Sequence, residues 1–191
     1  MVGNIPNFTK IDILRCFLRL SKNVGRQELA RELELGEGTM RSILNLLKSK
    51  SLLDSTKKGH FLSRKGKEKI DEILECVSIP RKMPFHDLYP EFKKIGIVVK
   101  NAQRLKDTYK LRDIAVKNGA EGAMILRFEK KLFAPDSDLK QDFYELEKFF
   151  ELRNGDSLII GFAEKNRNAE SGTFSIAVEM KETLKKFIND F

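Results

Sequence analysis

Four polar residues recur at helical spacing in the segment 39–50: Arg41, Ser42, Asn45 and Lys48. Residues three and four apart lie on the same face of a helix, so one helix would present all four together. An arginine can donate two hydrogen bonds to a guanine edge, and an asparagine can pair in a similar way with an adenine edge. Ser42 is expected to face the bases together with Arg41 and Asn45. Lysine side chains commonly contact phosphate oxygens. This combination on one helix face is typical of a surface that contacts nucleic acid.

The remaining positions of the same segment predict how this face is held outward. Met40, Ile43, Leu44 and Leu47 form an apolar stripe at the same spacing, which indicates an amphipathic helix with one buried side. Thr39 lies at the expected start of the helix. Its hydroxyl and its backbone amide are there in a position to hold a phosphate group.

A lysine-rich segment follows the polar helix. Residues 52–56 and 60–62 have the composition of two short strands, and the turn Lys57-Lys58-Gly59 between them predicts a β-hairpin. The two lysines are expected to lie along a nucleic-acid backbone or in a minor groove, with His60 beside them. Between residues 48 and 67 the chain has seven basic side chains and one acidic side chain. Such a surface favours a polyanionic partner.

Three further helices are predicted to position these residues. Residues 10–21 form an amphipathic helix capped by Thr9, with Asp12, Arg15, Arg19 and Lys22 on its outward face. Residues 26–34 form a second, shorter helix. Residues 64–77 form a fourth, capped by Ser63. The turn at residues 35–38 contains two glycines, which we expect to supply the positive φ of a tight reversal between helices.

The order helix, helix, turn, helix, basic hairpin, helix resembles the winged helix-turn-helix superfamily. The resemblance covers about the first 70 residues; residues 26–53 carry it, and Leu62-Ser63-Arg64-Lys65-Gly66 closes it. It implies binding to duplex DNA, with residues 39–50 as the recognition helix and residues 52–62 as the wing. The expected DNA contacts are Thr39, Arg41, Ser42, Asn45, Lys48, Lys57, Lys58 and His60.

Composition agrees with a charged, globular chain of 191 residues, long enough for two small domains. The formal net charge is +8, and residues 1–76 contain fifteen Lys and Arg against ten Asp and Glu. A positive charge of this size fits nucleic acid, an anionic membrane surface or an acidic protein. No apolar run is long enough to span a membrane, and no signal peptide is evident, so we expect a cytoplasmic protein. Cys16 and Cys76 are expected to be free thiols.

The second half of the chain has a different pattern. Two prolines and two basic residues in residues 79–85, with a third proline at Pro90, predict a linker over residues 79–91. The predicted domains are therefore 1–78 and 92–191. Four apolar strands alternate with helices after the linker, at residues 94–100, 123–128, 132–135 and 157–163, with helices at 111–118, 139–152 and 169–187. The predicted fold class is α+β, with an N-terminal winged helix-turn-helix followed by a mixed α/β domain whose strand order the sequence does not determine.

Three short motifs in this half carry a second resemblance. Leu111-Arg112-Asp113-Ile114-Ala115, Asn118-Gly119-Ala120-Glu121-Gly122-Ala123 and Phe133-Ala134-Pro135 are similar to archaeal winged-helix regulators with an uncharacterised C-terminal domain. That resemblance implies a domain that binds an effector or dimerises, and it supplies no ligand. Lys110, Arg112 and Asp113 are open to two interpretations, as polar pocket residues or as salt bridges. The ligand-binding residues are unknown at this stage.

Sequence motifs for catalysis and metal binding are missing. The glycines at 119 and 122 lack the Gly-Lys-Ser/Thr ending of a phosphate loop, and no nucleophile elbow or zinc-binding motif occurs. His60 and His86, the two histidines, belong to different predicted segments. We therefore expect no catalytic residues, no metal site and no cofactor.

These observations predict a DNA-binding transcriptional regulator that acts as a homodimer, with a small molecule as a possible effector of its C-terminal domain. The alternative is a winged helix that docks another protein in a transcription or replication assembly. A basic α/β enzyme with an appended winged helix is the third hypothesis. The operator sequence, the effector and the direction of regulation are not encoded in any motif of the sequence.

Overall fold

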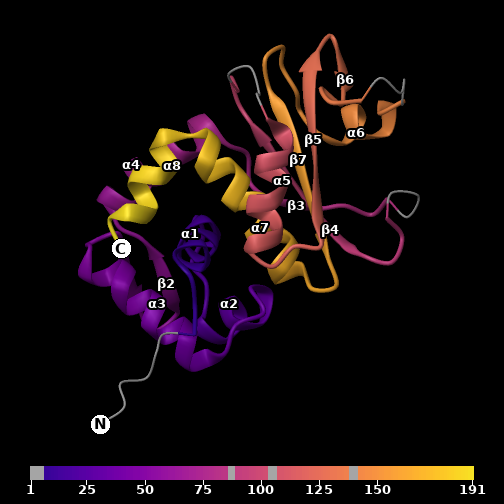
Figure 1. Ribbon diagram of the computed structural model, residues 1–191. Coiled ribbons are helices and arrows are strands. Elements are labelled where there is room, and N and C mark those ends of the chain that lie inside the picture. The colour runs from indigo at the N-terminus through magenta and orange to yellow at the C-terminus, as the bar shows by residue number, and fades with distance from the viewer. Residues whose placement is uncertain (1–6, 86–88, 103–106, 138–141) are drawn as a thin grey trace. The chain divides into compact units, whose positions relative to one another are not determined.

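The computed structural model describes residues 7–85, 89–102, 107–137 and 142–191. Within these residues the chain forms eight helices and two antiparallel sheets (Figure 1), which confirms the prediction of a mixed α and β protein. The chain divides into two compact units. The first consists of Met1–Ile73 together with Lys186–Phe191, and the second of Leu74–Lys185. The division falls inside the helix at residues 64–76, whereas the sequence predicts domains 1–78 and 92–191 joined by a linker over residues 79–91.

The first unit contains the helices and the hairpin that the sequence predicts. Its elements in chain order are α1 (Lys10–Arg19), α2 (Arg26–Glu32), α3 (Glu37–Ser49), β1 (Leu53–Thr56), β2 (Gly59–Leu62) and α4 (Arg64–Cys76). The helix α4 runs past Ile73 into the second unit. The apolar stripes predicted for α1 and α3 are buried at Ile13, Leu14, Phe17, Met40, Ile43 and Leu47. Burial of one face of each helix supplies most of the stability of such a unit.

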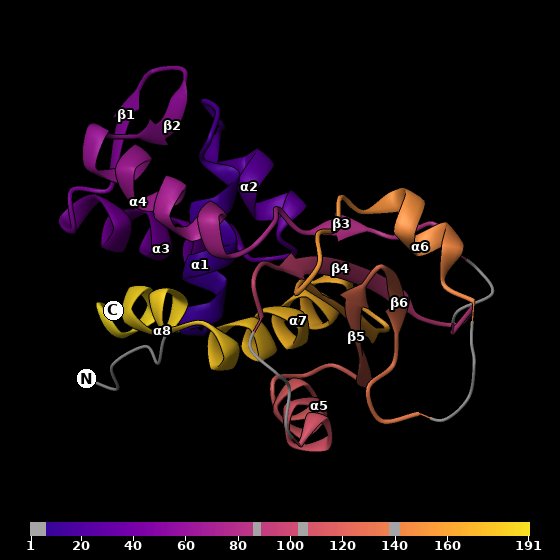
Figure 2. The ribbon, with the colours of Figure 1, turned by 90° about the horizontal axis from the view of Figure 1, so that it is seen from above.

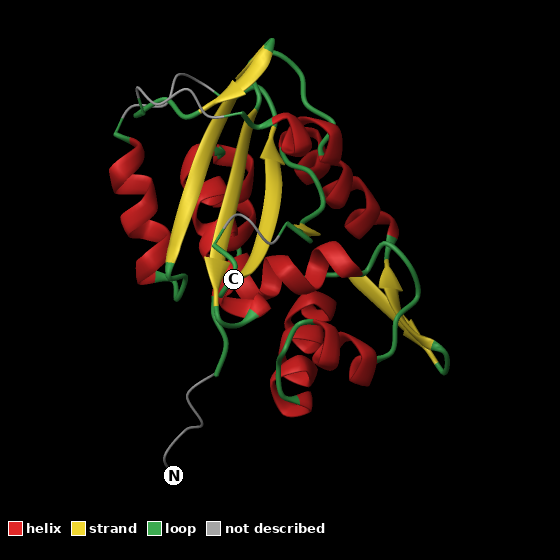
Figure 3. Ribbon diagram, turned by 90° about the vertical axis from the view of Figure 1, so that its right-hand side faces the viewer, coloured by secondary structure: helices red, strands yellow, loops and turns green. Residues whose placement is uncertain are grey.

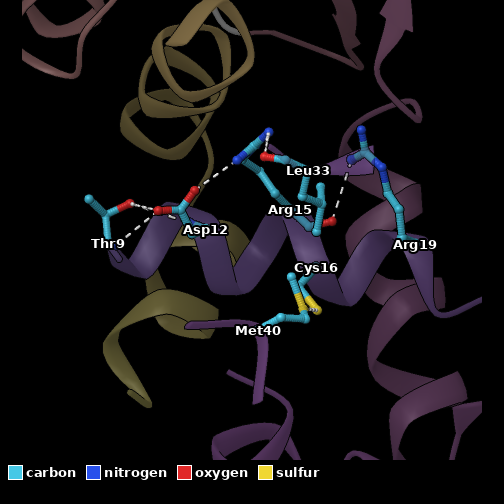
Figure 4. Close-up of polar contacts among 7 residues, drawn as sticks. All are labelled: Thr9, Asp12, Arg15, Cys16, Arg19, Leu33 and Met40. Carbon is cyan, nitrogen blue, oxygen red and sulfur yellow. Dashed lines mark hydrogen bonds and ion pairs between the residues drawn. The ribbon is translucent and has the colours of Figure 1, made fainter. Parts of the chain in front are cut away.

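The start of α1 is fixed by a capping box (Figure 4). Thr9 accepts a hydrogen bond from the Asp12 amide, and Asp12 accepts one from the Thr9 amide at 3.0 Å. The prediction that Asp12 and Arg15 face solvent is wrong, because both side chains are 1% exposed. They pair at 2.7 Å between Arg15 Nη1 and Asp12 Oδ1, and Arg15 Nη2 donates to the Leu33 carbonyl at 3.2 Å. Charged groups can be buried when they are paired and hydrogen-bonded in this way.

The turn between α2 and α3 differs from the prediction in its backbone. The residue with positive φ is Glu34 (φ 56°), whereas Gly36 has φ −67°. Glu34 follows Leu33, the C-cap residue of α2, and the Leu35 amide donates to the Ala30 carbonyl at 2.9 Å. The Glu34 amide donates to the Arg31 carbonyl at 3.3 Å, which completes a Schellman motif. These hydrogen bonds, and not a glycine, hold the left-handed residue.

The end of α3 repeats this motif with Ser51 in the left-handed conformation (φ 59°). The amides of Leu52 and Ser51 donate to the Leu47 and Lys48 carbonyls at 3.0 and 2.9 Å. Glycine adopts positive φ without the clash that a Cβ atom causes there. We expect Ser51→Gly to raise the free energy of unfolding by about 0.5–1 kcal/mol, measured by chemical denaturation followed by far-ultraviolet circular dichroism. A decrease in that free energy would contradict the assignment.

The second unit is built on a five-stranded sheet that is antiparallel throughout (Figure 3). Its elements are β3 (Arg81–Lys82), β4 (Lys93–Val99), α5 (Thr108–Lys117), β5 (Gly122–Glu129), β6 (Lys131–Phe133), α6 (Tyr144–Phe149), β7 (Ser157–Ala163) and α7 (Asn166–Met180), and α8 (Glu182–Asn189) continues from this unit into the first at Lys186. The strand order is β3-β4-β7-β5-β6. The edge strand β3 lies in the predicted linker, and the sequence did not predict it. Residues 86–88 of that linker, and residues 139–141 of a predicted helix, lie outside the described residues.

Helices cover both faces of this sheet (Figure 2). On one face α6 packs through Leu146, with Phe150 just after it, against Leu126, Leu158 and Ile160 of the central strands. On the other face α7 approaches β7 closely, because Gly161 has no side chain where a Cβ would lie 2.5 Å from the Ala169 carbonyl oxygen. The Thr173 hydroxyl accepts a hydrogen bond from the Gly161 amide at 3.0 Å. A hydroxyl on α7 thus bonds directly to the sheet.

The C-terminal helical region is two helices and not one. The sequence predicts a continuous helix over residues 169–187, whereas α7 ends at Met180 and α8 begins at Glu182. Lys181 between them is extended (φ −129°, ψ 113°), and its ammonium group donates to the Asn101 carbonyl at 3.0 Å. Neither glycine nor proline occurs at this break. The spacing of apolar residues is helical on both sides of it, so the sequence pattern predicts one continuous helix. Within the described residues, none of the helices combines the length and the apolar character that a membrane crossing needs.

Candidate functional site

The predicted polar face of α3 is exposed in the structure. Arg41, Ser42, Asn45 and Lys48 are all exposed, and Thr39 is half-buried. The opposite side of the helix anchors this orientation, because Met40, Ile43 and Leu47 are completely buried. The Ser42 hydroxyl donates to the Gly38 carbonyl at 3.2 Å. The other three exposed side chains, Arg41, Asn45 and Lys48, extend from a helix whose buried residues hold it against the core of the first unit.

The first turn of α3 differs from the expectation. The helix begins at Glu37, so Thr39 is its third residue and not its first. The Thr39 amide is still among the donors that a helix leaves without an internal partner, and could bind an anion. However, the Glu37 carboxylate lies in the same turn and opposes an approaching phosphate. Arg26 pairs with Glu37 at 3.4 Å and offsets part of that repulsion. Sequence reasoning did not single out Arg26.

The basic hairpin has two lysines at its tip. Thr56 pairs with Gly59, which leaves Lys57 and Lys58 as the two turn residues, both exposed. The Lys58 amide donates to the Thr56 hydroxyl at 3.2 Å. Gly59 has φ +138°, a conformation that residues with a Cβ rarely adopt, so this glycine is required by the turn.

The hairpin is tied to the rest of the first unit by a pairing that the sequence did not predict. The Val24 amide donates to the His60 carbonyl at 3.0 Å, and the His60 amide donates to the Val24 carbonyl at 2.9 Å. Residues 23–25 lie between the two helices that the sequence predicts at 10–21 and 26–34. Gly59 makes the close approach possible, because a Cβ there would lie 2.7 Å from the Val24 carbonyl oxygen. The orientation of the hairpin is therefore set by the segment before α2.

Two basic side chains, Lys48 and Lys65, form contacts between α3, the hairpin and α4. Lys48 of α3 contacts the Ser55 hydroxyl of β1 at 3.5 Å, and Lys65 of α4 donates to the Lys50 carbonyl at 3.2 Å. Asp54 is the one acidic residue in this stretch of sequence. We call the following seven residues the basic surface, and all of them are exposed: Lys48, Lys50, Lys57, Lys58, Arg64, Lys65 and Lys67. The structure thus presents the predicted charge to solvent.

His60 lies at the base of the hairpin with an altered basicity. Partial burial lowers the pKa of its imidazole below the ordinary value of 6.5, and the positive charges of Lys48 and Arg26 lower it further. Its Nδ1 atom is buried and has no hydrogen-bond partner within the described residues. The imidazole is therefore neutral at neutral pH, and it can act there as a hydrogen-bonding group rather than as a cation.

This depressed pKa predicts a pH dependence of stability. As the pH falls below 6.5, the unfolded chain binds a proton on His60 before the folded protein does, so the free energy of unfolding decreases. The loss is complete once the pH is below the folded-state pKa. His60→Gln should remove this component when unfolding is measured at about pH 5 and about pH 7.5. His86→Gln, at the second histidine, is the control. An unchanged pH dependence in His60→Gln would overturn the prediction.

Two of the three polar residues singled out in the second unit form ion pairs. Lys110 pairs with Asp107 at 2.8 Å, and Arg112 with Asp136 at 3.6 Å. The hydrogen bond that the Lys110 ammonium donates to the Asp107 carboxylate raises the pKa of Lys110. Of the two interpretations that the sequence left open, the salt bridge describes these two residues. Asp113 is exposed.

Cysteine and metal chemistry have little support in the part of the chain that the structure describes. Cys16 is buried with its Sγ 3.6 Å from Met40 Sδ, and burial raises the pKa of its thiol to about 12. A thiol that stays protonated is a poor nucleophile. Across residues 7–85, 89–102, 107–137 and 142–191, no group of three or more His, Cys, Asp and Glu residues is arranged to hold a metal ion.

Comparisons with known proteins place the two halves in described families. Residues 10–68 match the family "PH0730-like, N-terminal domain", and residues 90–180 match "Domain of unknown function (DUF4443)". Among solved structures, the hypothetical protein PH0730 from Pyrococcus horikoshii OT3 is similar, with 32% sequence identity and a TM-score of 0.81. The alignment covers 96% of this chain and 99% of that chain. No protein with curated annotation matches.

Proposed function

The chain belongs to the family of the Pyrococcus horikoshii protein PH0730, and from that premise we propose that it binds duplex DNA as a transcriptional regulator. The family descriptions assign no activity, so the proposal depends on the first unit alone. Its order of three helices, a hairpin and a fourth helix is that of a winged helix-turn-helix, with α3 as recognition helix and β1–β2 as wing.

The observation that carries the proposal is the exposure of the basic surface beside the polar face of α3. All seven of its cations are exposed, and Asp54 is the one carboxylate in the same stretch of sequence. Positive side chains on both sides of a helix meet the phosphates that border a major groove. A solvated lysine face without a partner would not need a row of Arg41, Ser42 and Asn45 beside it.

Each residue has a distinct role in this proposal. Arg41 and Asn45 contact base edges, the arginine suited to guanine and the asparagine to adenine. Ser42 faces the bases beside them, and the Thr39 amide contacts a phosphate oxygen. The lysines of the wing, Lys57 and Lys58, follow the backbone or enter the minor groove. His60, held by Val24, sets the angle of the wing toward the DNA.

One observation favours the alternative of a protein-docking surface. Leu46 is 36% exposed on α3, next to Asn45. An exposed leucine among polar residues is suited to a protein partner, although it also suits the methyl group of a thymine. The two functions differ in their response to salt, because only a phosphate-binding surface releases many condensed counterions when it binds.

A salt titration of binding to random duplex DNA tests the proposed function. If all seven cations of the basic surface contact phosphates, a plot of log K against log salt concentration has a slope of about −6. Fluorescence anisotropy of a labelled duplex, measured between about 50 and 200 mM salt, gives this slope. Absence of duplex binding at the lowest salt concentration would overturn the proposal and favour protein docking.

We propose that the second unit either joins two copies of the regulator into a homodimer or binds a small-molecule effector. A homodimer would present two recognition helices to two operator half-sites about one helical turn apart. A small-molecule effector would act by binding one conformation of the protein better than another. Sedimentation of the full chain with and without operator DNA distinguishes a monomer from a dimer.

A further inference from the structure

The second unit contains a cavity of about 380 Å³, within the range of small-molecule sites. Two neighbouring segments and one distant residue form its wall: Lys82 and Phe85 from the region of β3, Phe92, Lys93 and Lys94 from the start of β4, and Asn166 from the start of α7. Prolines and Met83 complete the lining. Neither of the two ion-paired residues Lys110 and Arg112 lies in it.

The described part of this cavity wall carries an unbalanced charge. Among the described lining residues, three are lysines and none is an aspartate or glutamate, and Asp87, in the segment 86–88 between Phe85 and Tyr89, lies outside the described residues. Lys94 is 6% exposed, and its ammonium donates to the Tyr89 carbonyl at 2.9 Å. Among the described residues, no carboxylate forms an ion pair with Lys82, Lys93 or Lys94. A largely buried ammonium is costly unless negative charge compensates it, so the cavity is suited to an anion.

The apolar part of the wall is aromatic. Phe85 and Phe92 are half-buried, so part of each ring is accessible. Their positions are fixed from behind, because Phe92 stacks on Phe162 of β7 with ring centroids 5.8 Å apart, and Phe85 packs against Phe149 at 5.3 Å. Rings held in this way can contact a flat apolar group at low entropic cost.

We propose that this cavity binds a small aromatic anion, with the lysines on its phosphate or carboxylate oxygens and the phenylalanines on its ring. The inference goes beyond DNA binding and does not depend on it, because every residue involved lies in the second unit. It gives the second unit a ligand class that the sequence left unknown.

Calorimetric titration of the full chain with four probes tests this inference. Phenyl phosphate and benzoate carry both parts of the proposed ligand, inorganic phosphate carries only the anion, and phenol carries only the ring. We expect saturable binding of at least one of the two aromatic anions, about tenfold or more tighter than that of phosphate or phenol. Equal affinity for all four probes, or no saturable binding of either aromatic anion, would overturn the inference.

Variants assign the binding to the cavity. Lys94→Met keeps the aliphatic stem and removes the charge, and it should weaken binding about tenfold or more. Lys82→Met does the same at an exposed position and should also weaken binding, which keeps the test valid if Lys94→Met fails to fold. The control is Lys131→Met, at the opposite edge of the sheet. Equal effects in Lys82→Met and Lys131→Met would overturn the inference, as would loss of binding in Lys57→Ala/Lys58→Ala, because that would place the anion on the basic surface.

Discussion

Replacing Gly66 by alanine is expected to lower the free energy of unfolding of the first unit by about 3 kcal/mol. Gly66 is buried in the first turn of α4, and a Cβ atom there would lie 2.0 Å from the Leu52 carbonyl oxygen and 3.2 Å from Leu62 Cδ2. The Leu52 carbonyl cannot retreat easily, because it accepts a hydrogen bond from the Ser63 amide at 3.1 Å. The backbone of α4 or of the hairpin would have to shift, which outweighs the helix propensity that alanine adds.

The matched control is Gly38→Ala, in a helix of the same unit. A Cβ atom on Gly38 would have no neighbour within 4 Å, so the same substitution should be neutral or stabilise by up to about 1 kcal/mol. The chain has no tryptophan, and its three tyrosines all lie in the second unit. Far-ultraviolet circular dichroism therefore follows both units, and tyrosine fluorescence follows the second. Equal free energies of unfolding in Gly66→Ala and Gly38→Ala would contradict the close approach of Gly66 to the Leu52 carbonyl oxygen.

Removing the two lysines at the hairpin tip should have the largest effect on DNA binding. If Lys57 and Lys58 each neutralise one phosphate, Lys57→Ala/Lys58→Ala flattens the salt dependence by about two units of slope. At low salt the affinity for every duplex sequence should fall roughly tenfold or more. Both side chains are exposed in the two-residue turn, so their loss leaves the fold of the hairpin unchanged. The measurement is the anisotropy titration of random duplex DNA.

Two further variants make this result specific. Lys117→Ala/Lys131→Ala removes the same charge from exposed positions of the second unit and should leave the slope unchanged. Asn45→Ala should preserve binding to random DNA and weaken only a preferred sequence, by about 1–3 kcal/mol. If the second-unit double variant reduced binding as much as the hairpin variant, net charge and not the proposed wing would explain the affinity.

The elements that the sequence predicts best are the helices whose apolar residues recur along one face only. Met40, Ile43 and Leu47 recur at helical spacing and are buried, so α3 and its exposed face follow from the pattern alone. The same pattern gave a wrong prediction at Asp12 and Arg15. Charged residues are usually exposed, but the ion pair between these two side chains and the cap contact of Asp12 with Thr9 allow both to be buried. The exposure of Arg41, Ser42, Asn45 and Lys48 on α3 was easier to predict, because polar side chains opposite a buried apolar stripe face solvent unless a distant segment covers them.

The rest of the fold depends on contacts between distant segments. The pairing of β4 with β7 joins Ile97 to Ile159, and no local pattern specifies that partner. The helix α7 is buried on all sides from Ala169 to Val178, so it lacks the one-sided period that predicts a surface helix. The cavity lysines are similarly hidden, because Lys82, Lys94 and the neighbouring Asn166 meet only through the sheet. The pairing of Val24 with His60, which holds the hairpin, is a single bridge. Because Val24 is not part of a strand, no alternating pattern in the sequence indicates this pairing.

The return of the chain to the first unit links the stabilities of both units. Phe187 packs against Phe17 with ring centroids 5.0 Å apart, so the first unit closes only when residues 186–191 are in place. If Leu74–Lys185 unfolded alone, it would become a flexible loop of 112 residues between two parts of one core. Closing such a loop costs about 4 kcal/mol in entropy. A molecule that stabilises the second unit therefore also makes the first unit harder to open, through the connectivity of the chain alone.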